Sequence, residues 1–73
     1  MVVNVSKLKG KMVEKGLTGA IISEKLNIDQ STFYRKLKEN GVTFTLDQVF
    51  LIVEVLELST KEAVEIFFTQ ELA

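Results

Sequence analysis

Four side chains within residues 30–39 have the clearest capacity for specific chemistry, because short polar groups and a guanidinium can hydrogen-bond to DNA base edges. They are Gln30, Ser31, Tyr34 and Arg35. A glutamine pairs with adenine through two hydrogen bonds, and an arginine pairs with guanine in the same way. A tyrosine contacts a thymine methyl group or a phosphate. The segment therefore predicts a recognition helix over about residues 30–39 that reads bases in the major groove of double-stranded DNA.

Five further residues are predicted to contact the phosphate backbone or to flank the base contacts. Lys36 and Lys38 suit phosphates because each is a flexible point charge, and Thr32 lies beside the base-reading residues. Thr18 and Thr45 each precede a predicted helix, whose first backbone N–H groups can hold an anion. These contacts would supply affinity without reading the base sequence.

The distribution of charge bears on whether this helix binds DNA or is an ordinary solvated surface, which would carry similar polar residues. The chain of 73 residues has a net charge of −1. Residues 1–38 contain eight basic and three acidic side chains, whereas residues 39–73 contain one basic and seven acidic side chains. A half with a net charge of +5 attracts a polyanion, so the distribution favours DNA binding over a surface without a ligand.

Five short helical patterns must position these side chains, and a residue that can cap a helix precedes each of them. The predicted N-caps are Ser6, Thr18, Asp29, Thr45 and Ser59, the last two within capping boxes. Gly16 and Asn27 suit the left-handed conformation that ends the first two helices. The third helix is predicted to end at Asn40, and the fourth to reach about Glu57.

The helical patterns predict a single all-α domain over residues 1–73, with a helix-turn-helix at about residues 18–38. The fourth helix is the most apolar, so we expect it to lie at the centre of the domain. Val2, Val3 and Val5 are expected to form a short extended arm before the first helix.

The composition excludes several classes of function. The chain contains neither cysteine nor histidine, which removes disulfides, the common zinc sites and a histidine base. It also lacks a glycine-rich phosphate loop, so we expect no enzyme activity, no cofactor, no metal site and no small-molecule substrate. Without a long apolar run or a signal peptide, the sequence predicts a cytoplasmic protein that does not enter a membrane.

Residues 18–37 resemble the helix-turn-helix of the phage repressor and Cro-type family, and the five-helix layout extends the resemblance over nearly the whole chain. The matching features are Thr18 before the second helix, Ile22, Ser23 and Leu26 within it, Ile28 and Asp29 in the turn, and Phe33 in the third helix. The resemblance implies a five-helix, lambda-repressor-like fold and a small transcriptional repressor of the kind found in phages and prophages of Gram-positive bacteria. It also implies that a homodimer binds a palindromic operator inside the bacterial host cell.

Three positions depart from the family pattern. Asn27 replaces the common glycine of the turn, Lys36 occupies a position that is more often apolar, and Gly19 is the third departure. Members of the family often have glutamine at the first position of the second helix, where it contacts phosphate and braces the first glutamine of the recognition helix. Gly19 occupies this position, so the brace for Gln30 is missing.

Apolar residues in the last helix predict a second surface. We expect Val64, Phe67 and Phe68 to contribute to a homodimer interface, because a terminal helix of a small domain cannot easily bury apolar residues on every side. Closure of the core by these phenylalanines is the alternative, and Ile21 is a further candidate for exposed apolar surface. A different function, protein–protein interaction through the acidic and apolar C-terminal half, would leave the helix-turn-helix as a scaffold only.

Overall fold

The computed structural model describes residues 3–68, which form five α-helices and no strand, so the predicted all-α class is confirmed. The helices are α1 (Val5–Lys15), α2 (Gly19–Leu26), α3 (Gln30–Lys38), α4 (Leu46–Val55) and α5 (Thr60–Phe67). Residues 1, 2 and 69–73 lie outside the described part, and so does Val2 of the predicted N-terminal arm.

Four helices begin at their predicted N-caps, and in three of them the cap side chain accepts a backbone hydrogen bond. Thr18 accepts a hydrogen bond from the Ile21 N–H, and Thr45 and Ser59 each complete a capping box. Each cap satisfies a backbone donor that the helix itself leaves unpaired. The starts of these helices are therefore fixed by local hydrogen bonds.

The start of α1 differs from the prediction, whereas α3 starts at its predicted cap without the expected side-chain hydrogen bond. The first helix begins at Val5 because Asn4, not Ser6, is its cap, and the Asn4 side chain accepts a hydrogen bond from the Lys7 N–H at 3.1 Å. Asparagine caps helices as well as serine does, so the earlier cap adds part of a turn to α1. Asp29 is the N-cap of α3 as predicted, but its side chain makes no capping hydrogen bond.

Four of the helices end in the same way, with a left-handed residue followed by a long backbone hydrogen bond that reaches back five residues. The left-handed residues are Gly16, Asn27, Asn40 and Glu57. The backbone N–H groups that donate these bonds belong to Leu17, Ile28, Gly41 and Leu58. This is the Schellman pattern, and at the ends of α1, α2 and α4 the apolar residue that donates the bond also packs against the core. It ends α4 at Val55, before the predicted limit at Glu57.

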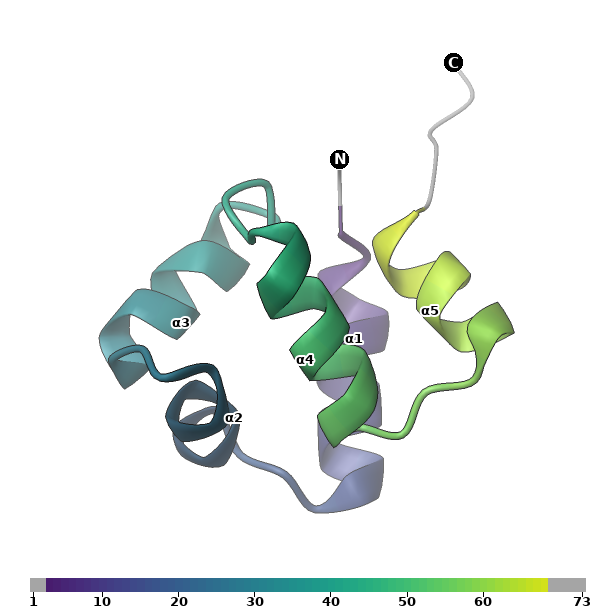
Figure 1. Ribbon diagram of the computed structural model, residues 1–73, viewed down its shortest axis with the longest axis horizontal. Coiled ribbons are helices and arrows are strands. Elements are labelled where there is room, and N and C mark those ends of the chain that lie inside the picture. Colours follow the sequence, from purple (N-terminus) through teal and green to yellow (C-terminus); the bar gives the residue numbers. More distant parts are fainter. Residues whose placement is uncertain (1–2, 69–73) are drawn as a thin grey trace.

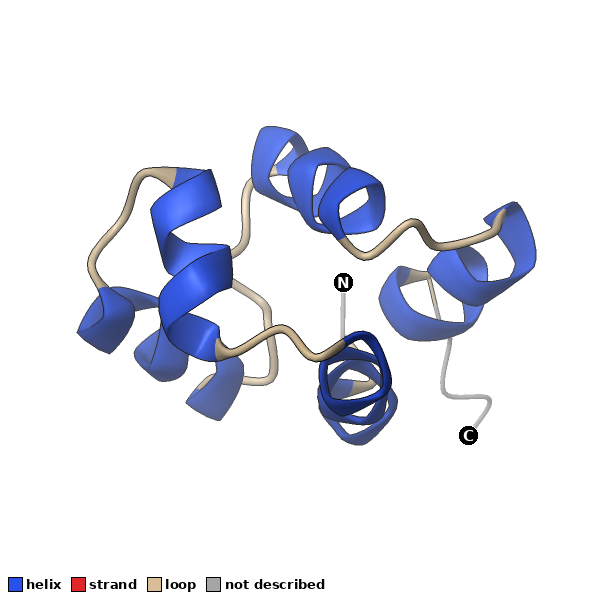
Figure 2. Ribbon diagram, turned by 90° about the horizontal axis from the view of Figure 1, so that it is seen from below, coloured by secondary structure: helices blue, strands red, loops and turns tan. Residues whose placement is uncertain are grey.

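The helices surround one core in which α1 and α4 face each other. Figure 2 shows these two helices on opposite sides, with α5 at one end of the molecule and α2 and α3 at the other. In Figure 1, α2 runs nearly along the line of sight while α3 and α4 lie across it, so α2 crosses both steeply. This arrangement leaves α3 at an end of the long axis, where its outer side is accessible.

The core draws on every helix, on Val3 before α1, and on Phe44 and Leu56 in the connections between helices. Its buried apolar residues are Val3, Leu8, Met12, Ile22, Leu26, Phe33, Leu37, Phe44, Val49, Ile52, Leu56, Ile66 and Phe67. Val3 donates a backbone hydrogen bond to the Asn40 carbonyl, while Val5 already belongs to α1. The predicted extended arm therefore does not include Val5, because the Asn4 cap starts the helix there.

The fourth helix, which we expected at the centre of the domain because of its apolar composition, is buried on one side only. Val49 and Ile52 face the core, but Leu46 and Phe50 are each 59% exposed and Leu51 is 39% exposed. A helix in a domain of this size packs on one side only, so apolar residues on its outer side remain in contact with solvent.

Ion pairs between α1 and α5 bring the basic and acidic halves of the sequence together. Lys7 pairs with Glu65, and Lys11 pairs with Glu62 and, at 3.0 Å, with Glu14. The strong separation of charge along the sequence is therefore partly cancelled in space. Positive charge that remains available lies mainly toward α2 and α3.

The charge of Glu62 makes stability depend on pH in the acidic range. A hydrogen bond from Lys11, followed by one from the Ser59 backbone N–H, lowers the pKa of Glu62 from 4.5 to about 2. Because the carboxylate is favoured in the folded state, its contribution is complete above pH 4.5 and is lost as the pH falls toward 2. Glu62→Gln keeps an oxygen for the capping box but removes this contribution.

We therefore expect wild type to lose more stability than Glu62→Gln between pH 5 and pH 2, as measured by urea unfolding at a series of pH values. Glu54→Gln is the matched control, because Glu54 forms no ion pair with residues 3–68. Its pH dependence should follow that of wild type. Parallel curves for Glu62→Gln and wild type would show that the Lys11 contact does not stabilise the fold.

Candidate nucleic-acid interface

The connection between α2 and α3 is a turn of three residues, Asn27, Ile28 and Asp29. Asn27 has a φ of 58°, and the half-buried Ile28 packs against the core. The buried Ser23 donates its hydroxyl hydrogen to the Ala20 carbonyl at 2.9 Å, which satisfies that polar group within α2. A short, internally bonded turn of this kind fixes α3 relative to α2.

The inner and outer sides of α3 are as the sequence predicted. Phe33 and Leu37 are buried, and the Phe33 ring contacts the rings of Tyr34 and Phe44 with centroid distances of 5.8 and 5.9 Å. Gln30, Ser31, Arg35 and Lys38 are exposed, and Thr32 is half-buried. Apolar anchors therefore hold the helix on the domain while its polar side chains face solvent.

Lys36 is less available for a phosphate than predicted. Its ammonium group donates a hydrogen bond to the Thr43 carbonyl at 2.8 Å and lies 5.9 Å from the centre of the Phe44 ring. Both contacts join the end of α3 to the connection that follows it. Thr45 is exposed at the start of α4, where its hydroxyl accepts a hydrogen bond from the Gln48 N–H. Both residues thus have structural roles in the segment that follows α3.

Tyr34 packs across the start of α2, at the position where the family pattern has a glutamine. A Cβ atom added at Gly19 would overlap the Tyr34 phenol ring, so the absence of a side chain at position 19 makes room for this ring. Tyr34 remains 45% exposed. The side chain of Gln30 makes no hydrogen bond to residues 3–68. Contact between Tyr34 and Gly19 therefore takes the place of the missing brace, but it holds the middle of α3 instead of its start.

Gly19→Ala should have opposite effects on the free energy of unfolding with and without the Tyr34 ring, and this difference would reveal the contact. In wild type the added methyl group displaces the Tyr34 ring and should destabilise the domain by about 1 kcal/mol. In a Tyr34→Ala background the same change should stabilise it by up to about 1 kcal/mol, since alanine favours a helix over glycine. Urea unfolding of wild type, the two single variants and the double variant measures the coupling free energy between residues 19 and 34. The fluorescence of Tyr34 reports its environment directly, because the chain has one tyrosine and no tryptophan.

Equal effects of Gly19→Ala in the two backgrounds would contradict a contact between these residues. Gly10→Ala in α1 is the control, because a Cβ at that position meets no atom within 4 Å. Its effect should not depend on residue 34.

The Tyr34 ring also forms part of a hollow between α1, α2 and α3 with a volume of about 350 Å³. Lys9, Thr18 and Leu37 line it as well. Lys9 forms no ion pair with residues 3–68, so its charge is available beside the cap of α2. Lys9 belongs to the basic half of the sequence, but it was not predicted to be a site residue. Its position depends on how α1 meets α2 and α3.

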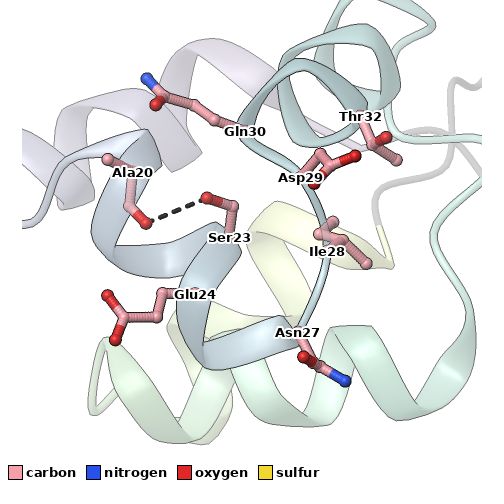
Figure 3. Close-up of a pocket in the computed structure, with 8 residues that line it drawn as sticks. All are labelled: Ala20, Ser23, Glu24, Asn27, Ile28, Asp29, Gln30 and Thr32. Atoms are coloured by element: carbon pink, nitrogen blue, oxygen red, sulfur yellow. Dashed lines mark hydrogen bonds between the residues drawn. The ribbon is translucent and has the colours of Figure 1, made fainter.

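A second open hollow, of about 610 Å³, lies over the turn between α2 and α3 and has the opposite charge. Figure 3 shows the residues around it, which are Ala20, Ser23, Glu24, Asn27, Ile28, Asp29, Gln30 and Thr32. Glu24 and Asp29 give it two negative charges, and no basic residue lines it. Gln30 extends from the start of α3 toward the end of α2 that carries Ala20. A phosphate is therefore disfavoured at this hollow and favoured on the side of Lys9.

The structure buries one of the three predicted dimer residues and leaves the other two exposed. Phe67 is fully buried in the core, so its inclusion in a surface was wrong: it faces inward beside Ile66. Val64 and Phe68 lie one turn apart and are 49% and 51% exposed. Ile21 is 38% exposed on α2. The candidate surface on α5 thus narrows to Val64 and Phe68.

Comparison with known proteins adds no assignment. Among residues 3–68, no helix combines the length and the apolar character needed to cross a membrane, and no three potential metal ligands gather at one place. No protein-family model matches the chain, and neither a curated protein nor a solved structure matches it.

Proposed function

We propose that the protein binds double-stranded DNA in a sequence-specific manner through a helix-turn-helix formed by α2 and α3. The observation that carries this proposal is the outer side of α3. Gln30, Ser31 and Arg35 are exposed there together, on a helix that Phe33 and Leu37 anchor to the core. Groups that are rigidly held and exposed at one end of a domain suit the major groove, which admits a single helix.

The chemistry of each side chain suggests its role in such a complex. Arg35 suits guanine and Gln30 suits adenine, each through two hydrogen bonds. Lys38 and Lys9 suit phosphates on either side of these contacts. Tyr34 lies against the start of α2, where its hydroxyl group is better placed for a phosphate than for a base. The acidic hollow at Asp29 would hold no phosphate, because Glu24 and Asp29 repel it.

The biological role that we propose is that of a small phage-type transcriptional regulator, acting as a repressor in the bacterial cytoplasm. A lambda-repressor-like arrangement of the five helices and a homodimer on a palindromic operator belong to this proposal. For such a dimer to bind, its two α3 helices must lie about one turn of DNA, or a whole number of turns, apart. Val64 and Phe68 are the residues that this dimer would bury.

Selection of binding sites from random duplex DNA, followed by titration at several salt concentrations, tests the proposal. We expect an enriched sequence and an affinity that falls with salt, with a log–log slope of about 0.9 for each phosphate contacted. A sequence preference without this slope, or the slope without a preference, would contradict specific binding through α3. No binding at low salt would reject DNA binding altogether.

A protein-interaction module is the second candidate function. It is favoured by the apolar residues exposed on α4 and α5, among them Phe50 and Phe68. On this proposal α2 and α3 are a scaffold only. The same DNA titration separates the two functions, because a scaffold has no reason to prefer one duplex sequence to another.

A further inference from the structure

The outer side of α4 is a continuous surface of three apolar and two acidic residues. We call it the α4 face, and it consists of Leu46, Asp47, Phe50, Leu51 and Glu54. All five are exposed. Residues three or four apart are neighbours on a helix, so Phe50 lies between Leu46, Asp47 and Glu54, and Leu51 lies beside Asp47 and Glu54. Leu46 and Phe50 therefore form an apolar patch, and the carboxylates of Asp47 and Glu54 separate it from Leu51 on the same face.

Neither folding nor DNA binding explains the α4 face. The buried side of α4, with Val49 and Ile52, already anchors the helix to the core. Glu54 lies in the last turn of α4, where the helix dipole disfavours a carboxylate, and it forms no ion pair with residues 3–68. Figure 2 shows α4 along one side of the molecule, whereas α3 lies at an end. Two carboxylates on this surface would also repel DNA.

The charges on the α4 face identify the kind of partner that it fits. The helix contains no lysine or arginine, so a second copy that met it face to face would bring like charges together. A complementary partner has apolar side chains to cover Phe50 and Leu46, with basic side chains beside them to pair with Asp47 and Glu54. We propose that the α4 face binds a basic amphipathic helix of another protein. Such helices bind through apolar residues that recur every three or four positions.

This inference is independent of the proposed DNA binding, and it names a partner for the second candidate function, protein interaction. Because α3 and the α4 face are separate surfaces, the domain could hold its partner and DNA at once. Failure of one proposal leaves the other unaffected.

Titration of the full chain with two synthetic helical peptides tests the inference. Both peptides have roughly 18 residues, which is long enough for an amphipathic helix. Their leucines are spaced alternately three and four positions apart. One carries lysine at the remaining positions and the other carries glutamate. We expect the lysine peptide to bind, with NMR shift changes centred on the amides of α4, and the glutamate peptide not to bind.

Substitutions then assign the binding to individual residues. Phe50→Ser should lower the affinity for the lysine peptide about tenfold or more, as loss of a central aromatic anchor does at interfaces. The double variant Asp47→Asn and Glu54→Gln should also lower the affinity for the lysine peptide, and it should reduce the salt dependence of binding. Val13→Ser is the control, since it removes an exposed apolar side chain from α1 and should have no effect.

Three results would overturn the inference. The first is the absence of shift changes in α4, or shifts centred on another helix. The second is equal binding of both peptides. Unchanged binding of the lysine peptide by Phe50→Ser would also overturn the inference, and Leu46→Ser repeats this test at a second apolar residue of the face. The third is self-association that Phe50→Ser abolishes in sedimentation experiments, because the occupant would then be a second copy of the chain.

Discussion

Phe67→Ala should destabilise the domain by about 3–5 kcal/mol, whereas Phe68→Ala should change the free energy of unfolding by less than about 1 kcal/mol. The two residues are adjacent in sequence and identical in type, but Phe67 is fully buried and Phe68 is 51% exposed. Truncation of Phe67 leaves a cavity lined by core residues from several elements. Truncation of Phe68 removes a side chain that already contacts water.

The consequence for Phe67→Ala is large because small domains have little stability to lose. Native proteins are stable by roughly 5–15 kcal/mol, and a domain of this size lies toward the lower limit. We therefore expect Phe67→Ala to be substantially unfolded at 37 °C, and Phe68→Ala to unfold like wild type. Urea titration followed by circular dichroism measures both. Similar losses for the two variants would contradict the orientation of α5.

This difference between neighbours shows which parts of the fold the sequence could predict. Caps such as Thr18, Thr45 and Ser59 act within three residues, so their effect is visible in the sequence. Whether Phe67 or Phe68 faces inward depends instead on where α5 meets α1. The same holds for Phe50, whose exposure depends on how many neighbours α4 has in a domain of five helices.

The candidate site divides in a similar way. The inner side of α3 could be predicted because Phe33 and Leu37 follow the helical period. The contact between Tyr34 and Gly19 joins residues 15 positions apart, and it requires knowledge of how α2 crosses α3. Lys11 pairs with Glu62, which is far from it in the sequence. The basic and acidic halves are therefore less separated in space than the distribution of charge along the sequence predicted. Periodicity and local caps are therefore predictable, whereas contacts across helices are not.

Arg35→Ala and Lys38→Ala should separate base reading from phosphate binding on α3. If Arg35 pairs with a guanine, its loss should reduce the preference for the selected sequence by about 1–3 kcal/mol, roughly 5- to 150-fold. Affinity for unrelated sequences should fall much less. Lys38→Ala should instead weaken all sequences alike and lower the salt slope by about 0.9. Competition titrations with selected and unrelated duplexes measure both effects.

The structure makes these variants clean tests of function. Arg35 and Lys38 are exposed and form no ion pair with residues 3–68, so neither substitution should affect folding. Lys61→Ala is the control, because Lys61 lies on α5, at the opposite end of the molecule from α3 (Figure 1). It should change neither preference nor salt slope. Equal losses for Arg35→Ala on all sequences would make Arg35 a phosphate contact, and the reading of bases would then rest on Gln30 and Ser31.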